Sequence, residues 1–158
     1  MGEYADLTLN APNLYTWIAE LSEANTADLA RGMTFGAIGM TGIALLPLLQ
    51  SKYRADCDDL WIAMAAFFAA FIPFVLPHMH ERYFYMADIF ALIFVLRNPK
   101  KWYVGAACIL PSLFVVMKYL YFTHQEIIKL AIVAVVMLGG VCMLGAELFK
   151  AVQSNLLP

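Results

Sequence analysis

The 158-residue sequence has few charged residues, few cysteines and no excess of positive charge. Charged side chains make up only 14% of the chain, and 10 Lys and Arg stand against 12 Asp and Glu. The resulting net charge of −2 points to no class of partner, and no nucleic-acid motif is present, so we expect no nucleic-acid partner. Three cysteines cannot build a disulfide framework, and none are paired at a metal-binding spacing.

Apolar residues, by contrast, are abundant and gathered into long runs. They make up 63% of the sequence, where soluble domains have about 45–50%. The mean hydropathy is +0.72. Five runs stand out: Gly32–Leu49, Leu60–Leu76, Tyr83–Leu96, Trp102–Phe122 and Ile127–Leu148. Because a membrane span needs about 20 apolar residues and must pair its own backbone groups, these runs predict an all-α polytopic membrane protein of about five transmembrane helices.

The third run is the shortest of the five. It has about 14 residues, which gives about 21 Å of helix at the usual rise. It reaches bilayer thickness only if the helix begins near Pro77, a residue suited to a first helical turn. The sequence therefore predicts a helix from Pro77, with His78–Arg82 inside or just under one headgroup layer.

The positive residues predict an orientation. Lys and Arg favour the cytoplasmic side of a membrane. One predicted side holds Lys52, Arg54, Arg97, Lys100, Lys101 and Lys150, and the other holds Arg31, Arg82, Lys118 and Lys129. We therefore predict an outer tail over residues 1–30, a transmembrane bundle over 31–150 and a cytoplasmic tail over 151–158. The protein is expected in the plasma membrane, with its N-terminus and the His78–Arg82 loop extracytoplasmic.

The first 30 residues are polar and acidic and carry no signal-peptide pattern. Such a tail would cross the membrane easily if another span preceded it. We therefore expect this chain to be the C-terminal part of a longer membrane protein, with unaided translocation of the tail as the alternative. Within the tail, Leu14, Trp17, Ile18 and Leu21 recur at helical spacing and predict a short amphipathic helix at the membrane interface.

Glycines at intervals of three or four residues predict close helix packing. They lie in the first run (Gly32, Gly36, Gly39 and Gly42) and in the fifth (Gly139, Gly140 and Gly145). Small residues let helices approach within a bundle. Packing within the chain is the simpler interpretation, and homodimerisation is the alternative.

Residues 77–88, Pro-His-Met-His-Glu-Arg-Tyr-Phe-Tyr-Met-Ala-Asp, place titratable groups between two apolar runs. Ionisable residues at membrane depth suggest a functional site. On a helix, Glu81, Tyr85 and Asp88 would share one face, with His78 and Arg82 beside them. Asp88 would lie deeper and pair with a Tyr or with carbonyls freed by Pro111.

The histidines and the guanidinium of this motif suit a phosphate or pyrophosphate at headgroup height. Lys118, at a similar predicted depth, could pair with Glu81 or add a phosphate donor. A structural ion-pair network is an alternative. Metal binding by His78, His80 and Glu81 is disfavoured, because a helix splays residues two apart and helical zinc pairs prefer i, i+4 spacing. We therefore expect no metal and no other cofactor.

Two segments resemble a known group of proteins. The segment 9–15, Leu-Asn-Ala-Pro-Asn-Leu-Tyr, followed by the motif 77–88, resembles the C-terminal region of bacterial multi-span mannosyltransferase-like proteins. These are similar to the second GPI mannosyltransferase and belong to the wider GT-C class; the related ER glucosyltransferases have a similar His-Glu-basic element. The resemblance covers about residues 7–150.

The resemblance implies an enzyme that transfers a sugar from a polyprenyl-phosphate donor. It implies that His80 and Arg82 bind the donor phosphate, supported by His78 and Lys118, while Glu81, Tyr85 and Asp88 orient them. The catalytic base of the class lies in a first outer loop that has no counterpart here, and Asp6 and Asp28 do not match its motif. The base is therefore unknown, and a companion N-terminal part is expected as a partner, besides membrane lipid. The alternatives are a non-catalytic scaffold subunit and a small proton- or cation-coupled transporter.

Overall fold

The computed structural model describes residues 8–9, 11–21, 26–50, 58–121 and 129–155. Its helices are α1 (Tyr15–Leu21), α2 (Thr26–Gln50), α3 (Asp58–Val75), α4 (Tyr85–Arg97), α5 (Trp102–Leu120) and α6 (Leu130–Asn155). Two short 3₁₀ helices, η1 (Glu81–Phe84) and η2 (Pro99–Lys101), precede α4 and α5. Two-residue strands, β1 (Thr8–Leu9) and β2 (Met79–His80), form the sheet in the described residues. The prediction of an all-α fold is confirmed.

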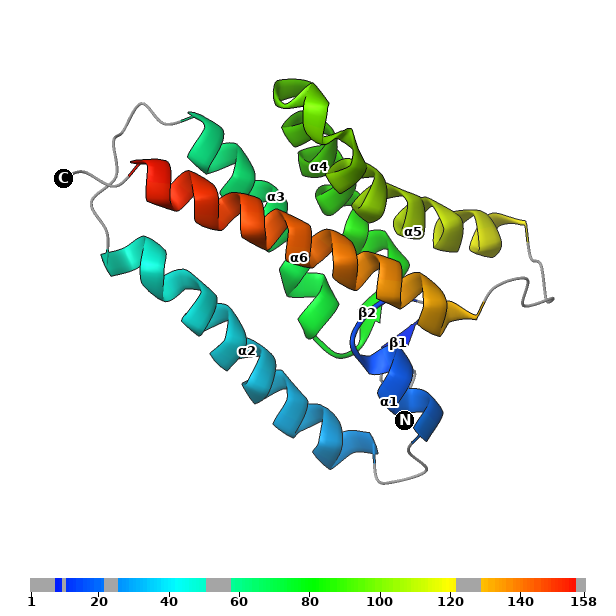
Figure 1. Ribbon diagram of the computed structural model, residues 1–158. Helices are drawn as coiled ribbons and strands as arrows, with labels where there is room; N and C mark the ends of the chain where they lie inside the picture. The colour runs from blue at the N-terminus through cyan, green and yellow to red at the C-terminus, as the bar shows by residue number, and fades with distance from the viewer. Residues whose placement is uncertain (1–7, 10, 22–25, 51–57, 122–128, 156–158) are drawn as a thin grey trace.

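Helices α3, α4, α5 and α6 form a bundle in which each packs against two neighbours. The contacts join α3 to α4, α4 to α5, α5 to α6 and α6 to α3. Successive helices run in opposite directions, so the bundle has two ends (Figure 1). We call the end with residues 76–85 the motif end. The opposite end, where Asp59, Arg97, Lys101, Glu147 and Lys150 gather, is called the ion-pair end.

Apolar residues at helical spacing, many of them alanines, make the bundle core. The buried positions include Ala63, Ala66 and Ala70 of α3; Ala87, Ala91 and Phe94 of α4; Val104, Cys108 and Val115 of α5; and Met137, Val141, Leu144 and Leu148 of α6. Spacings of three and four residues place each set on one face of its helix. The faces turned outward are also apolar, with Ile89, Leu113 and Val135 among the exposed residues. Helices that are apolar all round suit a lipid environment.

Three helical segments in the described part of the chain are long and apolar enough to cross a membrane: Asp58–Val75, Pro99–Lys118 and Leu130–Ser154. The apolar stretch of α2, Ala30–Leu46, is shorter. Helix α4 has 13 residues, or about 20 Å at the usual helical rise. The structure thus supports a membrane protein with three candidate spans, and the count of five stays a prediction.

The predicted helix start at Pro77 is wrong. His78 adopts a left-handed backbone conformation with φ 58°, and Met79 and His80 form β2. The helix begins as the 3₁₀ turn Glu81–Phe84 and becomes α-helical only at Tyr85. The physical reason is that β1 pairs with the backbone of β2, which extends these residues and prevents helix formation before Glu81.

The glycines divide into two groups. A Cβ on Gly140 would lie 2.7 Å from the Cys108 sulfur and 3.0 Å from the Ala107 backbone, so α5 and α6 approach closely there. Gly145 faces the Phe67 ring in the same way. In contrast, a Cβ on Gly32, Gly36, Gly39 or Gly42 of α2 would meet nothing within 4 Å. Within the residues that the structure describes, close packing is therefore found at the α6 glycines and not at the glycine face of α2.

Candidate functional site

The motif end joins the two segments on which the resemblance rests. Strands β1 and β2 pair in parallel, with Thr8 opposite Met79 and Leu9 opposite His80. A segment near the start of the sequence is thus fixed beside residues about 70 positions later. Figure 1 shows β1 and the adjoining α1 under the end of α3, where the chain turns into β2. Sequence spacing alone gave no sign of this pairing.

The segment after β1 caps the carboxyl end of α3. The backbone N–H of Leu14 donates to the carbonyl of Phe74 at 3.0 Å, and the Tyr15 hydroxyl donates to the carbonyl of Val75 at 2.6 Å. The last carbonyls of an α-helix have no partner within the helix. Tyr15 is only 2% exposed, and burial raises the pKa of its hydroxyl, so the neutral, donating form is favoured. This contact fixes the position at which α3 ends.

The Ala-Pro-Asn turn that leads into α1 is itself fully buried. Asn13 Oδ1 accepts a hydrogen bond from the Tyr15 N–H at 3.1 Å, and the Thr16 hydroxyl donates to the Ala11 carbonyl at 3.1 Å. An Asn side chain that bonds the backbone two residues on is a common way to build a turn. Trp17 then packs edge-on against Phe74. The predicted short helix exists as α1, and it packs on the bundle.

The His-Glu-Arg element follows directly from β2. In η1, Phe84 is fully buried and anchors the turn, while Arg82 and Tyr83 are exposed and Glu81 is half-buried. The His80 ring lies 6.1 Å from the Tyr83 ring, centre to centre. The buried phenylalanine therefore anchors the element on the bundle while the Arg82 side chain stays accessible.

A pocket of about 300 Å³ lies where η1 and α4 meet α5. It is lined by Glu81, Arg82, Tyr85, Val116 and Leu120. Of the predicted site residues, the structure brings Glu81, Arg82 and Tyr85 together in this pocket.

The other predicted residues lie outside that pocket lining. His78 and His80 precede η1 on the same chain segment. Lys118 is on α5, between Val116 and Leu120, which line the pocket. Among the described residues, neither Glu81 nor Arg82 makes an ion pair with Lys118. The predicted Glu81–Lys118 pair is therefore not found in the described part of the chain.

Asp88 lies deeper, between α4 and α5. Its Oδ2 accepts a hydrogen bond from the Ser112 hydroxyl at 2.7 Å, and its Oδ1 is buried without a partner in the described residues. The prediction that Asp88 would pair with a Tyr or with carbonyls freed by Pro111 is wrong. The partner is the hydroxyl of Ser112, the residue after Pro111, which is buried and reaches Asp88 from α5.

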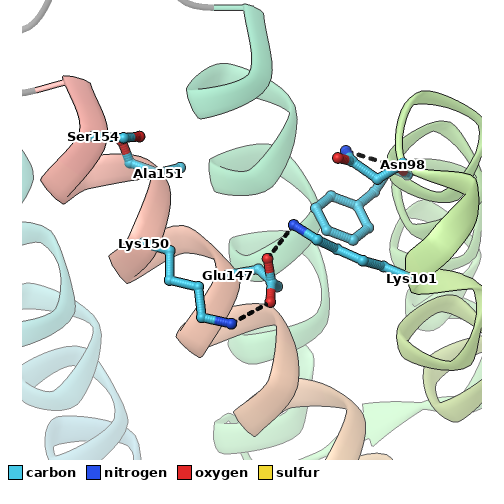
Figure 2. A network of polar contacts seen from close by, with 7 residues as sticks. Asn98, Lys101, Glu147, Lys150, Ala151 and Ser154 are labelled. Carbon is cyan, nitrogen blue, oxygen red and sulfur yellow. Dashed lines mark hydrogen bonds and ion pairs between the residues drawn. The ribbon is translucent and has the colours of Figure 1, made fainter.

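Sequence reasoning missed a second polar cluster at the ion-pair end. Lys101 and Lys150 both donate to the Glu147 carboxylate, Lys150 at 2.8 Å, and Glu147 is only 8% exposed (Figure 2). The Lys101 ammonium also lies 5.8 Å from the centre of the Phe94 ring. Glu147 lies near the end of a long apolar run, three residues before Lys150. The i, i+3 spacing of these two opposite charges is the sequence feature that could have predicted part of this cluster.

An exposed ion pair adjoins this cluster. Arg97 Nε donates to Asp59 Oδ1 at 2.9 Å. This hydrogen bond and the negative charge of Asp59, with a smaller effect of Asp58, raise the pKa of the Arg97 guanidinium. Both pairs line one cavity of about 460 Å³ between the ends of α3, α4 and α6 and the 3₁₀ helix η2.

Among the residues that the structure describes, no group of three or more His, Cys, Asp or Glu could hold a metal ion. Asp6 and the side chain of Asp28 lie outside the described residues. No protein-family model, curated protein or solved structure matches this chain. The described residues thus form an α-helical protein with three candidate membrane spans and with polar sites at both ends of its bundle.

Proposed function

We propose that the motif end binds the phosphate of a polyprenyl-phosphate sugar, as part of a glycosyltransferase of the GT-C class in the plasma membrane. The main support for the proposal is that two segments distant in the sequence are adjacent in the structure. The segment 9–15 and the motif 77–88, which together resemble this class, are brought together by the β1–β2 pairing and the capping of α3. Two unrelated chance similarities would not be expected to lie side by side.

The chemistry of the pocket supports the same proposal. The Arg82 guanidinium has no ion-pair partner among the described residues, so its N–H donors are available to a phosphate in bidentate geometry. His80 would add a donor from the neighbouring strand. Val116, Leu120 and the Tyr85 ring offer apolar surface to the first isoprene units of a lipid tail. Glu81 would accept a hydrogen bond from a sugar hydroxyl.

The location supports it too. The pocket lies at the end of α5, one of the candidate spans, where lipid headgroups would lie. A phosphate leaving group gains negative charge as the sugar departs, and fixed donors in a water-poor site stabilise such charge. No residue of this chain is assigned the role of catalytic base, so the test measures donor binding and does not depend on turnover.

The experiment compares Arg82→Ala, Arg82→Lys and His80→Ala in their binding of a short-chain polyprenyl phosphate, with the purified chain in detergent. A hydrogen bond to a charged group contributes about 1.5–3 kcal/mol, so Arg82→Ala should weaken binding by about tenfold or more. Arg82→Lys should recover only part, because Lys lacks the bidentate fork. Lys100→Ala, an exposed cation at the ion-pair end, is the matched control and should bind as the unaltered chain does.

Helical content is measured by circular dichroism for every variant. If Arg82→Ala and His80→Ala fold and bind the polyprenyl phosphate with unchanged affinity, the proposal is wrong. A decrease in affinity as salt rises should accompany the binding, since partly exposed charges are screened.

A further inference from the structure

The charged residues that line the cavity at the ion-pair end form two groups of opposite net charge, which we call its two poles. One pole is the group of Lys101, Lys150 and Glu147, where two ammonium groups share one carboxylate and leave a net charge of about +1 at neutral pH. The other is the group of Asp58, Asp59 and Arg97, where two carboxylates face one guanidinium and leave about −1. Both poles line the same cavity of about 460 Å³.

Each pole keeps hydrogen-bonding capacity for a ligand. A lysine ammonium has three donors, and Lys101 and Lys150 each use one on Glu147. Figure 2 shows the two lysines reaching the carboxylate from opposite sides. At the other pole, Asp58 makes no hydrogen bond or ion pair among the residues that the structure describes, and it is exposed at the start of α3. An anionic group suits the first pole and a cationic group the second.

We infer that this cavity binds a phosphoethanolamine group, with its phosphate on Lys101 and Lys150 and its primary ammonium on Asp58 and Asp59. This group carries the two opposite charges a few bonds apart, and its ammonium supplies N–H donors to carboxylates. A glycerol-type phosphate headgroup would leave the acidic pole unmatched. A choline headgroup would bring positive charge without N–H donors. The cavity would thus select a zwitterion that has a phosphate at one end and a primary ammonium at the other.

The position of the cavity fits a headgroup as well as a free molecule. It lies where α3 and α5 begin and α6 ends, that is, at one end of all three candidate spans. Trp61 and Trp102 are exposed near the same ends of α3 and α5, as tryptophans are at membrane–water interfaces. Phosphoethanolamine could be presented by a lipid or arrive free in solution, and the experiment separates the two.

The test measures retention of defined lipids by the purified full chain, using native mass spectrometry from detergent. Phosphatidylethanolamine, phosphatidylglycerol and phosphatidylcholine with identical acyl chains are compared. We expect phosphatidylethanolamine to bind at least about fivefold more tightly than the other two. Soluble phosphoethanolamine is added as a competitor: displacement shows that the headgroup suffices, and selective lipid binding without displacement shows that the lipid form is the ligand.

Two variants address the two poles separately. Asp58→Asn should reduce binding of phosphatidylethanolamine to the level of phosphatidylglycerol and leave the latter unchanged. Lys150→Gln should weaken both, and Lys129→Gln, a lysine just before α6 at the motif end, is the matched control with no expected effect. Asp58 makes no hydrogen bond or ion pair with the described residues that its loss would break, so Asp58→Asn remains informative if Lys150→Gln fails to fold. Equal retention of the three lipids, or unchanged selectivity in Asp58→Asn, overturns the inference.

Discussion

The two ends of the bundle are held by different kinds of contact. At the motif end, main-chain carbonyls of α3 are capped by Leu14 and Tyr15, and β1 pairs with β2. At the ion-pair end, the polar contacts between helices in the described residues are made by side chains, through Glu147 with its two lysines and through Asp59 with Arg97. The pairing of β1 with β2 uses backbone groups and leaves Arg82 without an ion-pair partner among the described residues, whereas the ion pairs already occupy Glu147 and Asp59.

This difference bears on where ligands can bind. Arg82 is exposed and unpaired within the described chain, in a segment already fixed by Phe84 and by the strands. Because the backbone here is already fixed, an external partner has only the Arg82 side chain left to order. At the ion-pair end, a ligand must instead share cations that already hold a carboxylate. We therefore expect single substitutions at the two ends to have different consequences for stability and binding.

The largest effect on stability is expected from Glu147→Ala. Removing the carboxylate leaves two ammonium groups close together around a site that is 8% exposed in the native chain. Breaking a buried pair by deleting one partner is strongly destabilising, and solvent access to the lysines reduces the loss, so we expect a fall of about 2 kcal/mol in the free energy of unfolding. Denaturant titration in detergent, followed by circular dichroism, measures it.

Asp59→Ala is the matched control for this prediction. It breaks the Arg97–Asp59 pair, in which both side chains are more than half exposed. Exposed pairs contribute little and are screened by salt, so the loss should be much smaller and should vanish at high ionic strength. If the two variants lost equal stability, the burial of Glu147 would not make its ion pairs more stabilising than the exposed Arg97–Asp59 pair.

A smaller effect is expected at the motif end from Tyr15→Phe. The substitution keeps the ring and removes the hydroxyl that donates to the Val75 carbonyl. A buried acceptor left without its donor costs about 1–3 kcal/mol, and we expect about 1 kcal/mol here. Tyr121→Phe, at an exposed tyrosine, should change nothing.

The same hydroxyl predicts a pH dependence. Burial raises the pKa of Tyr15 above that of the unfolded chain, so the native state holds this proton more tightly. Its contribution to stability is then complete below about pH 10 and is lost as the pH rises through the native pKa. The difference in unfolding free energy between the native sequence and Tyr15→Phe should shrink above about pH 10. If this difference stayed constant up to pH 12, the hydrogen bond from the Tyr15 hydroxyl to Val75 would not be the source of its contribution to stability.

The sequence allowed the helices to be predicted better than either polar site. Continuous apolar runs identify α3, α5 and α6, since their length is a local property. The helix start at Pro77 was missed because the partner that extends Met79 and His80 is a distant backbone segment. Ser112 was missed as the partner of Asp88 because helix rotation decides it. Glu147 was missed because a single acid ending an apolar run resembles an ordinary span boundary.

The smallest expected effect concerns the turn at the motif end and compares two histidines. His78 has φ 58°, in the left-handed region, whereas His80 is extended with φ −89°. A residue with a Cβ pays about 1 kcal/mol in the left-handed region, and glycine does not. His78→Gly should therefore be more stable than His78→Ala by somewhat less than 1 kcal/mol, because glycine also gains freedom in the unfolded chain.

At His80 the order should reverse, with His80→Ala more stable than His80→Gly by about 0.5–1 kcal/mol. Each pair of variants lacks the imidazole, so the lost ring contacts cancel within a pair and only the backbone preference remains. Denaturant titration of the four variants measures both differences. If the alanine variant were the more stable one at both positions, the left-handed turn at His78 would not contribute to the structure of the motif end. The position of Arg82 would then depend on Phe84 and on the strand pairing.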